Sequence, residues 1–188
     1  MSNAGTVYRP NAFPPSLDIG NATAETLFQN KIGGALVLPL QNDGQWTNAR
    51  LAVHIGGRVQ TTSNLNYTLA VYFSSNTVFG VPATVAQSTK IYTTGPTIVN
   101  NKQTNWQLDL NIFWDGTSKT FCGNTIGQIG DYILGQNTLI ATPTADPNLH
   151  NSSNSFQNVF YALSFTGLFS GSSSGNHAFI DVCSLEHL

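Results

Sequence analysis

The chain has few charged residues. Seven Lys or Arg and nine Asp or Glu residues make up 9% of its 188 residues, whereas an ordinary soluble domain carries about 25%. Charge normally keeps a domain monomeric and protects the exposed edges of its β-sheets. The hydrophobic content is nevertheless 40%, enough for a core. We therefore expect a folded protein that is partly covered by other copies of itself or by another surface.

Sparse positive charge and the lack of long apolar stretches exclude two classes of partner. The Lys and Arg residues are scattered singly, so no basic stripe exists to neutralise phosphates, and we expect no nucleic-acid binding. No apolar run approaches the roughly 18 residues of a membrane helix, so we expect no membrane partner. Residues 1–15 also lack the apolar stretch of a secretory signal. With Met1 as the start, this predicts synthesis in a reducing cytoplasm.

The sequence also has few residues that carry chemistry. Its two cysteines, Cys122 and Cys183, lie in strand-like segments, and we expect buried free thiols there rather than a disulfide or a metal pair. The four histidines are not at metal-ligand spacing, the acidic residues are isolated, and no catalytic signature is present. We therefore expect no metal, no cofactor and no enzymatic activity.

What the chain does have is a repeated alternation of apolar and polar residues. It is clearest in NWQLDLNIFWD, where Trp106, Leu108, Leu110, Ile112 and Trp114 share one face of a strand. Both tryptophans therefore belong to the core. Gly56-Gly57 predicts a bulge or bend in an earlier strand. Regular spacing of such segments with almost no helix predicts an all-β fold, an antiparallel β-sandwich or jelly roll of about eight to ten strands.

The N-terminal segment differs from the rest. Residues 1–22 contain Pro10, Pro14 and Pro15 and predict an extended N-terminal arm, followed by a single domain at 23–188. The arm is either a frayed terminus or a segment that lies on a neighbouring subunit through Tyr8 and Phe13. One short helix is predicted within 21–34, at AETLFQN, with Gly33-Gly34 ending it.

The segment 159–169 is apolar on both faces of a strand. Val159, Tyr161, Leu163, Phe165 and Phe169 share one face, and a second set shares the other: Phe160, Ala162 and Leu168. An antiparallel strand with a solvated face should alternate apolar with polar residues. The second face is therefore covered, either by a loop of the same chain or by a neighbouring subunit. We favour the subunit, and predict an interface at Tyr8, Phe13, Phe160, Ala162 and Leu168.

Four runs resemble a group of tailed-phage virion proteins: ARLAVHIGGRVQTTSNLNYTLAVYFSSN, NWQLDLNIFWDGTSKTFCG, FYALSFTGLFS and HAFIDVCSLEHL. The resemblance covers roughly residues 49–188 and consists of strand patterning. It is to capsid decoration (cement) proteins of jelly-roll type, which are typically trimeric and bind the outside of the head. One departure is Ser74-Ser75, where the pattern has a glycine turn after the "LYF" strand.

The resemblance implies a virion structural protein that is made in the host cytoplasm and sits on the outer capsid surface. Its partners would be the major capsid protein and further copies of the chain, as a homotrimer that stabilises the shell by bridging its subunits. The alternative is a tail, baseplate or fibre jelly-roll protein that binds a receptor glycan. Trp46, in the turn-like segment QNDGQWTNA, would then be the glycan-binding residue.

Overall fold

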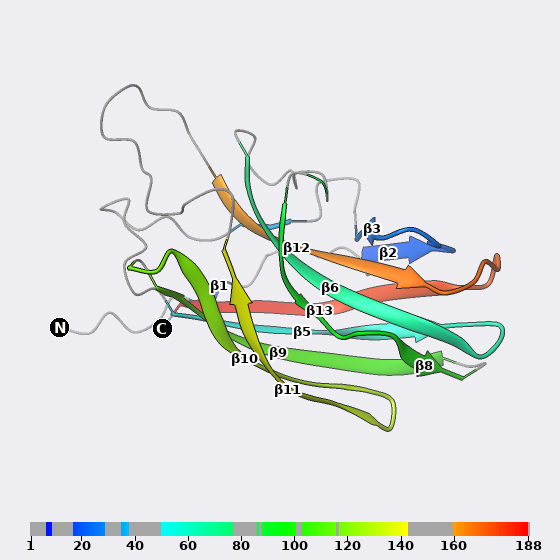
Figure 1. The fold of residues 1–188 in the computed structure, drawn as a ribbon. Coiled ribbons are helices and arrows are strands. Elements are labelled where there is room, and N and C mark those ends of the chain that lie inside the picture. The colour runs from blue at the N-terminus through cyan, green and yellow to red at the C-terminus, as the bar shows by residue number, and fades with distance from the viewer. Residues whose placement is uncertain are drawn as a thin grey trace.

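The computed structural model describes residues 7–8, 17–28, 35–37, 50–76, 86, 88–100, 103–115, 117–142 and 160–187. These residues form antiparallel strands and no α-helix (Figure 1). The strands are β1 (Val7–Tyr8), β2 (Leu17–Gly20), β3 (Thr26–Leu27), β4 (Ala35–Val37), β5 (Arg50–Gln60), β6 (Leu65–Asn76), β7 (Thr89–Thr93), β8 (Thr97–Val99), β9 (Gln103–Asp115), β10 (Thr120–Ile129), β11 (Tyr132–Ala141), β12 (Phe160–Phe169) and β13 (His177–His187).

The strands form two sheets that pack face to face. The first has the order β1-β13-β5-β9-β10-β11, with β2 also on β13; the second has the order β3-β12-β6-β7, with β4 on β12 and β8 on β6. β5 pairs with β13 in one sheet while β6 pairs with β12 in the other. Consecutive strands β5 and β6 therefore lie in different sheets, and so do β12 and β13. The predicted antiparallel β-sandwich is confirmed. Eight strands have five or more residues: β5, β6, β7, β9, β10, β11, β12 and β13.

The core lies between the sheets and follows the alternation in the sequence. Every second residue of β9, from Trp106 to Trp114, is buried, which confirms the predicted core face and the core position of both tryptophans. The Phe121 ring of β10 packs across the sandwich against Phe73 of β6 and, within its own sheet, against Trp114 of β9, each at 4.8 Å between ring centroids. The Phe121–Phe73 contact therefore joins one sheet to the other.

The bulge predicted at the two glycines of β5 lies instead in the partner strand β13, directly opposite them. Between Ile180 and Val182 the register of β13 shifts against β5, so that Ile180 faces Gly57 and Val182 faces Gly56. A Cβ atom at Gly57 would collide with the carbonyl oxygen of Phe179. The close approach of the two backbones therefore requires glycine at this position.

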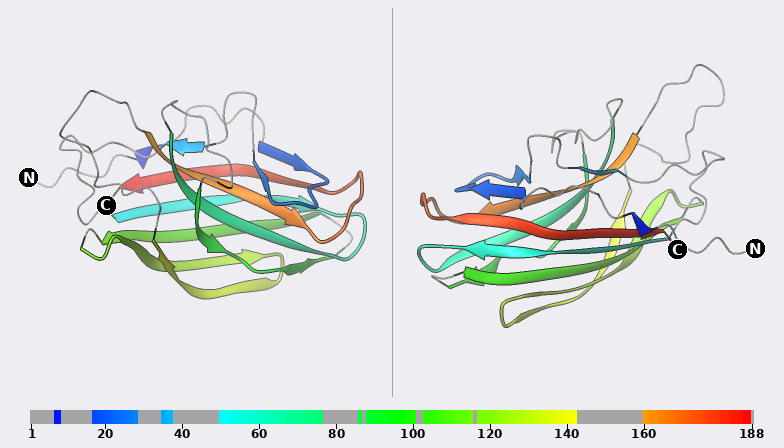
Figure 2. Two further views of the ribbon diagram at one scale, coloured as in Figure 1. Left: turned by 45° about the horizontal axis from the view of Figure 1, so that its top comes forward. Right: turned by 180° about the vertical axis from the view of Figure 1, so that it is seen from behind.

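The helix predicted within 21–34 is wrong for the described part, residues 21–28. Thr26–Leu27 is strand β3, and the Phe28 N–H donates to the Phe165 carbonyl at 2.9 Å. The Ala22 carbonyl accepts from the Phe169 N–H at 2.8 Å. Hydrogen bonds to β12 and burial of Phe28 outweigh the weak local preference for helix. Figure 2 shows β2 and β3 lying beside β12 and β13.

The described part of the predicted arm belongs to the sandwich. β1 pairs with Leu185 and Glu186 of β13, and β2 pairs with the other half of the same strand. Ile19 is a core residue at 4% exposure. Phe13 lies outside the described residues. The extended backbone of this segment therefore adds two short strands to the first sheet, beside β13.

The outer face of the second sheet is covered by the chain itself at its described centre. Ser164 and Thr166 of β12 point away from the core and are fully buried in the single chain, as are Ala70 and Tyr72 of β6. The same chain therefore covers these positions, and the neighbouring subunit expected from the sequence is not needed there. Leu168 on this face is half-buried. The glycine turn after Phe73 is also absent, because β6 continues through Ser74 and Ser75 to Asn76.

A charged pair lies at this covered face. Glu25 accepts hydrogen bonds from Thr166 Oγ1 at 2.9 Å and from Lys90 Nζ at 3.1 Å. Burial raises the pKa of Glu25, but hydrogen bonds from Tyr72, Lys90 and Thr166 outweigh burial and hold that pKa below its ordinary value. A carboxyl with a lowered folded-state pKa stabilises the fold above its unfolded-state pKa and loses this contribution in acid.

Replacing Glu25 with Gln should therefore lower the free energy of unfolding by about 1 kcal/mol at about pH 7. The difference from the natural chain should shrink as the pH falls below 4.5, the ordinary pKa of Glu25, and through the lower pKa of the folded state. Urea denaturation at several pH values measures this. Asp109→Asn, in an exposed pair with His54, is the control, with a loss of only a few tenths of a kcal/mol. A pH-independent difference for Glu25→Gln would contradict the assignment.

Candidate ligand-binding cleft

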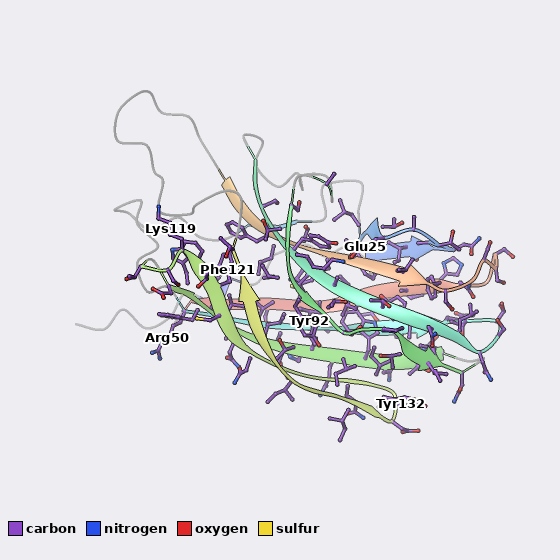
Figure 3. All side chains as sticks on the ribbon, in the orientation of Figure 1. Glu25, Arg50, Tyr92, Lys119, Phe121 and Tyr132 are labelled. Atoms are coloured by element: carbon purple, nitrogen blue, oxygen red, sulfur yellow. The ribbon has the colours of Figure 1, made fainter. Side chains whose placement is uncertain are left out.

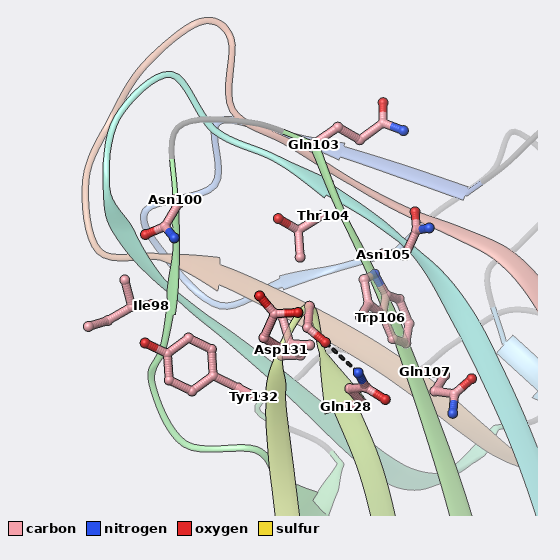
Figure 4. Close-up of a pocket in the computed structure, with 12 residues that line it drawn as sticks. Ile98, Asn100, Gln103, Thr104, Asn105, Trp106, Gln107, Gln128, Asp131 and Tyr132 are labelled. Carbon is pink, nitrogen blue, oxygen red and sulfur yellow. Dashed lines mark hydrogen bonds between the residues drawn. The ribbon is translucent and has the colours of Figure 1, made fainter.

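An open cleft of about 440 Å³ lies at one end of the sandwich. One wall comes from β8 of the second sheet, and the other comes from β9 and the β10–β11 turn of the first sheet (Figure 4). In Figure 3, Tyr132 marks this end of the β10–β11 ribbon and Lys119 marks the opposite end. The lining residues are Ile98, Asn100, Gln103, Thr104, Asn105, Trp106, Gln107, Gln128, Ile129, Gly130, Asp131 and Tyr132.

The turn that carries two of these residues is tightly specified. Ile129 pairs with Tyr132, so the loop has two residues, Gly130 and Asp131. Gly130 has a φ of 56°, and glycine at the first position of a two-residue hairpin loop is typical of a type II′ turn. The Gly130 N–H donates to the Asn105 carbonyl at 2.9 Å, and the Gln128 side-chain amide donates to the Gly130 carbonyl at 2.5 Å. The backbone therefore holds Asp131 and Tyr132 in place beside β9.

The chemistry of the cleft is polar and almost uncharged. Five of the lining residues are Asn or Gln, and Asp131 is the one charged residue among the described ones. Tyr132 is 50% exposed and Ile98 is 49% exposed, so the mouth of the cleft has an aromatic and an aliphatic surface. Trp106 is nearly buried and forms part of the wall. Tyr132 pairs with the buried Ile129 and so lies on the inner side of the first sheet, whereas Asn105, Gln107 and Gln128 alternate with buried residues and lie on its outer side.

A second hollow, of about 470 Å³, lies on the outer face of the first sheet at the far end of β5 and β9. Its polar residues are Arg50, Asn111 and Asn124. The Arg50 guanidinium lies 5.9 Å from the centroid of the Phe113 ring, a cation–π contact. Arg50 is therefore already engaged by an aromatic ring of the same hollow.

The few charges on the outer face of the first sheet are mostly paired. His54 Nδ1 lies 2.5 Å from Asp109 Oδ1. Arg58 donates two hydrogen bonds to Asp181, at 2.7 and 3.0 Å, and its guanidinium lies 4.7 Å from the Phe179 ring centroid. The Arg58 and Asp181 charges therefore offset each other, and such a face has few charges to attract a charged partner over a distance.

The residues predicted as an interface are not brought into one described site. Tyr8 lies in β1 of the first sheet, whereas Phe160, Ala162 and Leu168 lie in β12 of the second sheet. Phe13 lies outside the described residues, and so does Trp46, the predicted glycan-binding residue. The sequence analysis did not predict a site at the residues that line the cleft. The available signal was Gly130-Asp131-Tyr132, a turn followed by an aromatic residue.

Both cysteines are free thiols; burial, predicted for both, holds for Cys183 but not for Cys122, which is half-buried. Cys183 is buried, and burial raises its pKa to about 12. Burial and, secondarily, Asp115 raise the pKa of the half-buried Cys122. Both thiols are therefore poor nucleophiles at neutral pH. In the described ranges, no three His, Cys, Asp or Glu residues gather as metal ligands would, and no helix there is long and apolar enough to cross a membrane.

Neither a protein-family model nor a curated protein matches the sequence. Among solved structures, the chain is similar to one described as "Structure of infectious bursal disease virus Gx strain". That match has a TM-score of 0.27 and 13% sequence identity, and it covers 100% of this chain and 42% of that chain. The chain thus spans less than half of the length of the protein it matches.

Proposed function

We propose that this chain is a virion structural protein, a decoration or cement protein on the outside of a phage head. Its partners are the major capsid protein and further copies of itself, as a homotrimer, after synthesis in the host cytoplasm. A protein that binds across neighbouring shell subunits stabilises the assembled shell by mass action, because only the assembled state offers the whole site.

The observation that carries this proposal is β11, an edge strand of the first sheet as far as the structure describes it. It has ten residues, no charge and no proline, and among the described residues it pairs with β10 alone. Ile133 on this strand is 82% exposed. Monomeric proteins usually blunt such an edge with lysine, proline or a bulge. β11 has neither lysine nor proline, and its pairing with β10 is interrupted by one register shift, where Thr125 pairs with Asn137 but Gly127 pairs with Leu134. An edge of this kind suits pairing with another subunit.

The natural chain should therefore self-associate, and Ile133→Lys should shift it to monomer. A buried lysine at a subunit contact is costly, whereas Ile133 is exposed enough for the change to leave the fold intact. Light scattering over a concentration series measures the mass. Val182→Lys adds the same charge at an exposed apolar residue of β13 and should leave the mass unchanged. A strictly monomeric natural chain would remove the support that β11 lends to the proposal.

Binding to heads is the direct test of the decoration role. The chain should co-sediment with undecorated heads, and occupancy should change little between low and high salt because its charged residues are few. The variant Tyr8→Ala/Phe13→Ala tests the predicted arm contacts while keeping residues 17–20, which form β2. Occupancy should fall in this variant with the same thermal stability. No binding by the natural chain would contradict the head location, and unchanged binding by the variant would remove the arm from it.

The second candidate is a tail, baseplate or fibre protein that binds a receptor glycan. The cleft supports it, because half-exposed Tyr132 and Ile98 give its mouth an apolar surface. The residue predicted for this role, Trp46, stays a prediction. Location on head or tail is separated by labelling virions with an antibody to the chain and viewing them by electron microscopy.

A further inference from the structure

We infer that the hollow at Arg50 is a docking site for a second copy of this chain. Its occupant is the tip of the β10–β11 hairpin, Gly130–Asp131, of the neighbouring copy, and the Asp131 carboxylate meets the Arg50 guanidinium. This inference rests on the self-association proposed above and names the two surfaces that meet.

The hollow is built by four side chains that share the outer side of the first sheet. Arg50 of β5 pairs with Phe113 of β9, and Asn111 of β9 pairs with Asn124 of β10. Each of the four is next to a buried residue that points into the core. All four side chains therefore lie around one hollow of about 470 Å³.

The Arg50 guanidinium is a cation without an acidic partner in the described part of the chain. Arg58 and Lys90, by contrast, form ion pairs with carboxylates of the same chain. The contact of Arg50 is the Phe113 ring, whose centroid lies 5.9 Å away. Contact with a ring face leaves the N–H donors of a guanidinium available. A carboxylate from outside the chain can therefore bind there, through two parallel hydrogen bonds.

An acceptor beside this cation also lacks a partner. Asn124 Oδ1 is buried and makes no hydrogen bond with the described residues. Such an atom is costly in a folded protein, and a donor from a docked segment would relieve the cost. A segment that carries a carboxylate and backbone N–H groups offers what Arg50 and Asn124 each require.

The matching anion lies on the same sheet. Asp131 is exposed, and the described residues around it include no Lys or Arg. The other carboxylates whose side chains are described either face a basic side chain or bind the turn that follows them: Asp18, Glu25, Asp109, Asp181 and Asp115. Asp131 is therefore the complement to Arg50 that the chain itself provides.

The hairpin tip suits the hollow in size and rigidity. It is a two-residue turn in which Gly130 has no side chain, so the tip is narrow. The volume of the hollow falls in the range of sites that hold a small ligand, roughly 300–1,000 Å³. The Gly130 N–H donates to the Asn105 carbonyl, so docking orders little backbone that is not already held. Ile133, 82% exposed, follows the tip and adds apolar surface to the contact.

One copy cannot place its own tip in its own hollow. The turn is bonded to Asn105 and the hollow lies at Phe113, and this separation along β9 corresponds to about 26 Å. Arg50 and Tyr132 accordingly lie at opposite ends of the molecule in Figure 3. A contact between two different patches is heterologous, and it forms a ring where the rotation closes. In the proposed homotrimer each copy gives one tip and receives one.

The test reverses the two charges separately and together in the full chain. Arg50→Glu and Asp131→Arg each place like charges against each other and should weaken self-association roughly tenfold or more. The double variant Arg50→Glu/Asp131→Arg restores opposite charges and should associate nearly as the natural chain does. Gln60→Glu adds an acid on the same face at the other end of β5 and should leave the association unchanged.

Sedimentation equilibrium over a concentration series measures the dissociation constant of each variant. Thermal unfolding checks that the fold is kept, which is expected because Arg50, Asp131 and Gln60 are exposed.

The outcomes separate this contact from the self-association on which it depends. A natural chain that stays monomeric would remove both. Self-association that either single reversal leaves unchanged would overturn the contact and leave the proposed self-association standing. A double variant as weak as the single ones would also overturn it, because the two charges would then not face each other. Lower occupancy of Arg50→Glu on heads with unchanged self-association would assign the hollow to an acidic segment of the shell, and so overturn it too.

Discussion

Replacing Phe121 with Ala is expected to lower the free energy of unfolding by about 3–5 kcal/mol. The ring is 1% exposed and contacts Trp114 within its own sheet and Phe73 in the other, both at 4.8 Å between centroids. Its loss removes apolar burial and leaves a cavity between two rings that are held by their own strands. Urea denaturation followed by tryptophan fluorescence measures the change, since Trp114 lies beside the cavity.

The same strand offers a matched control for this substitution. Ile126 of β10 points away from the core and is 53% exposed, so Ile126→Ala should change stability by no more than about 0.5 kcal/mol. Equal losses for the two variants would mean that Phe121 does not join the sheets as the structure shows. A large loss for Phe121→Ala alone supports the aromatic contact between the sheets as a main stabilising feature.

Gly57→Ala is expected to lower the free energy of unfolding by about 1–3 kcal/mol, although it adds only one methyl group. The added Cβ would collide with the backbone carbonyl of Phe179. A backbone carbonyl in a paired strand cannot turn aside as a side chain can. The β5–β13 ladder would therefore separate locally and lose hydrogen bonds next to the register shift. Hydrogen exchange of amides in β5 and β13 should show faster exchange on both sides of this position.

The neighbouring glycine provides the comparison. A Cβ at Gly56 would lie 3.3 Å from the Trp106 carbonyl oxygen, a contact that a shift of a few tenths of an ångström relieves. Gly56→Ala should therefore cost no more than about 1 kcal/mol. If Gly56→Ala proved the more harmful of the two, the placement of the β13 bulge opposite these glycines would be wrong.

The strands and their core faces could be predicted because successive side chains of a strand point to opposite faces. The alternation of apolar and polar residues therefore shows which face is buried. Trp106, Leu108 and Leu110 alternate with polar residues, and only one face of such a strand can be buried at low cost. The glycine pair in β5 was also informative, because glycine within a strand usually marks a bulge or a close backbone approach. Neither inference needed knowledge of the partner strand.

The failure at residues 21–28 has the opposite cause. The local sequence weakly prefers helix, yet Phe28 is completely buried and its N–H bonds to Phe165, more than a hundred residues away. No local pattern announces a pairing over such a distance, and packing readily overrides a preference worth a few tenths of a kcal/mol per residue. The same holds for the cover over Thr166, since Glu25 reaches it only in the folded chain.

The sequence by itself determined the fold class, the inward faces of the long strands and the neutral, polar character of the surface, because side-chain alternation and composition act locally. Only the tertiary structure decided that β11 is an edge strand of the described sheet, that the chain covers the centre of its own second sheet, and that Ile98 and Tyr132 meet around one cleft. These features depend on strand order, and strand order follows from contacts between residues that are distant in the sequence.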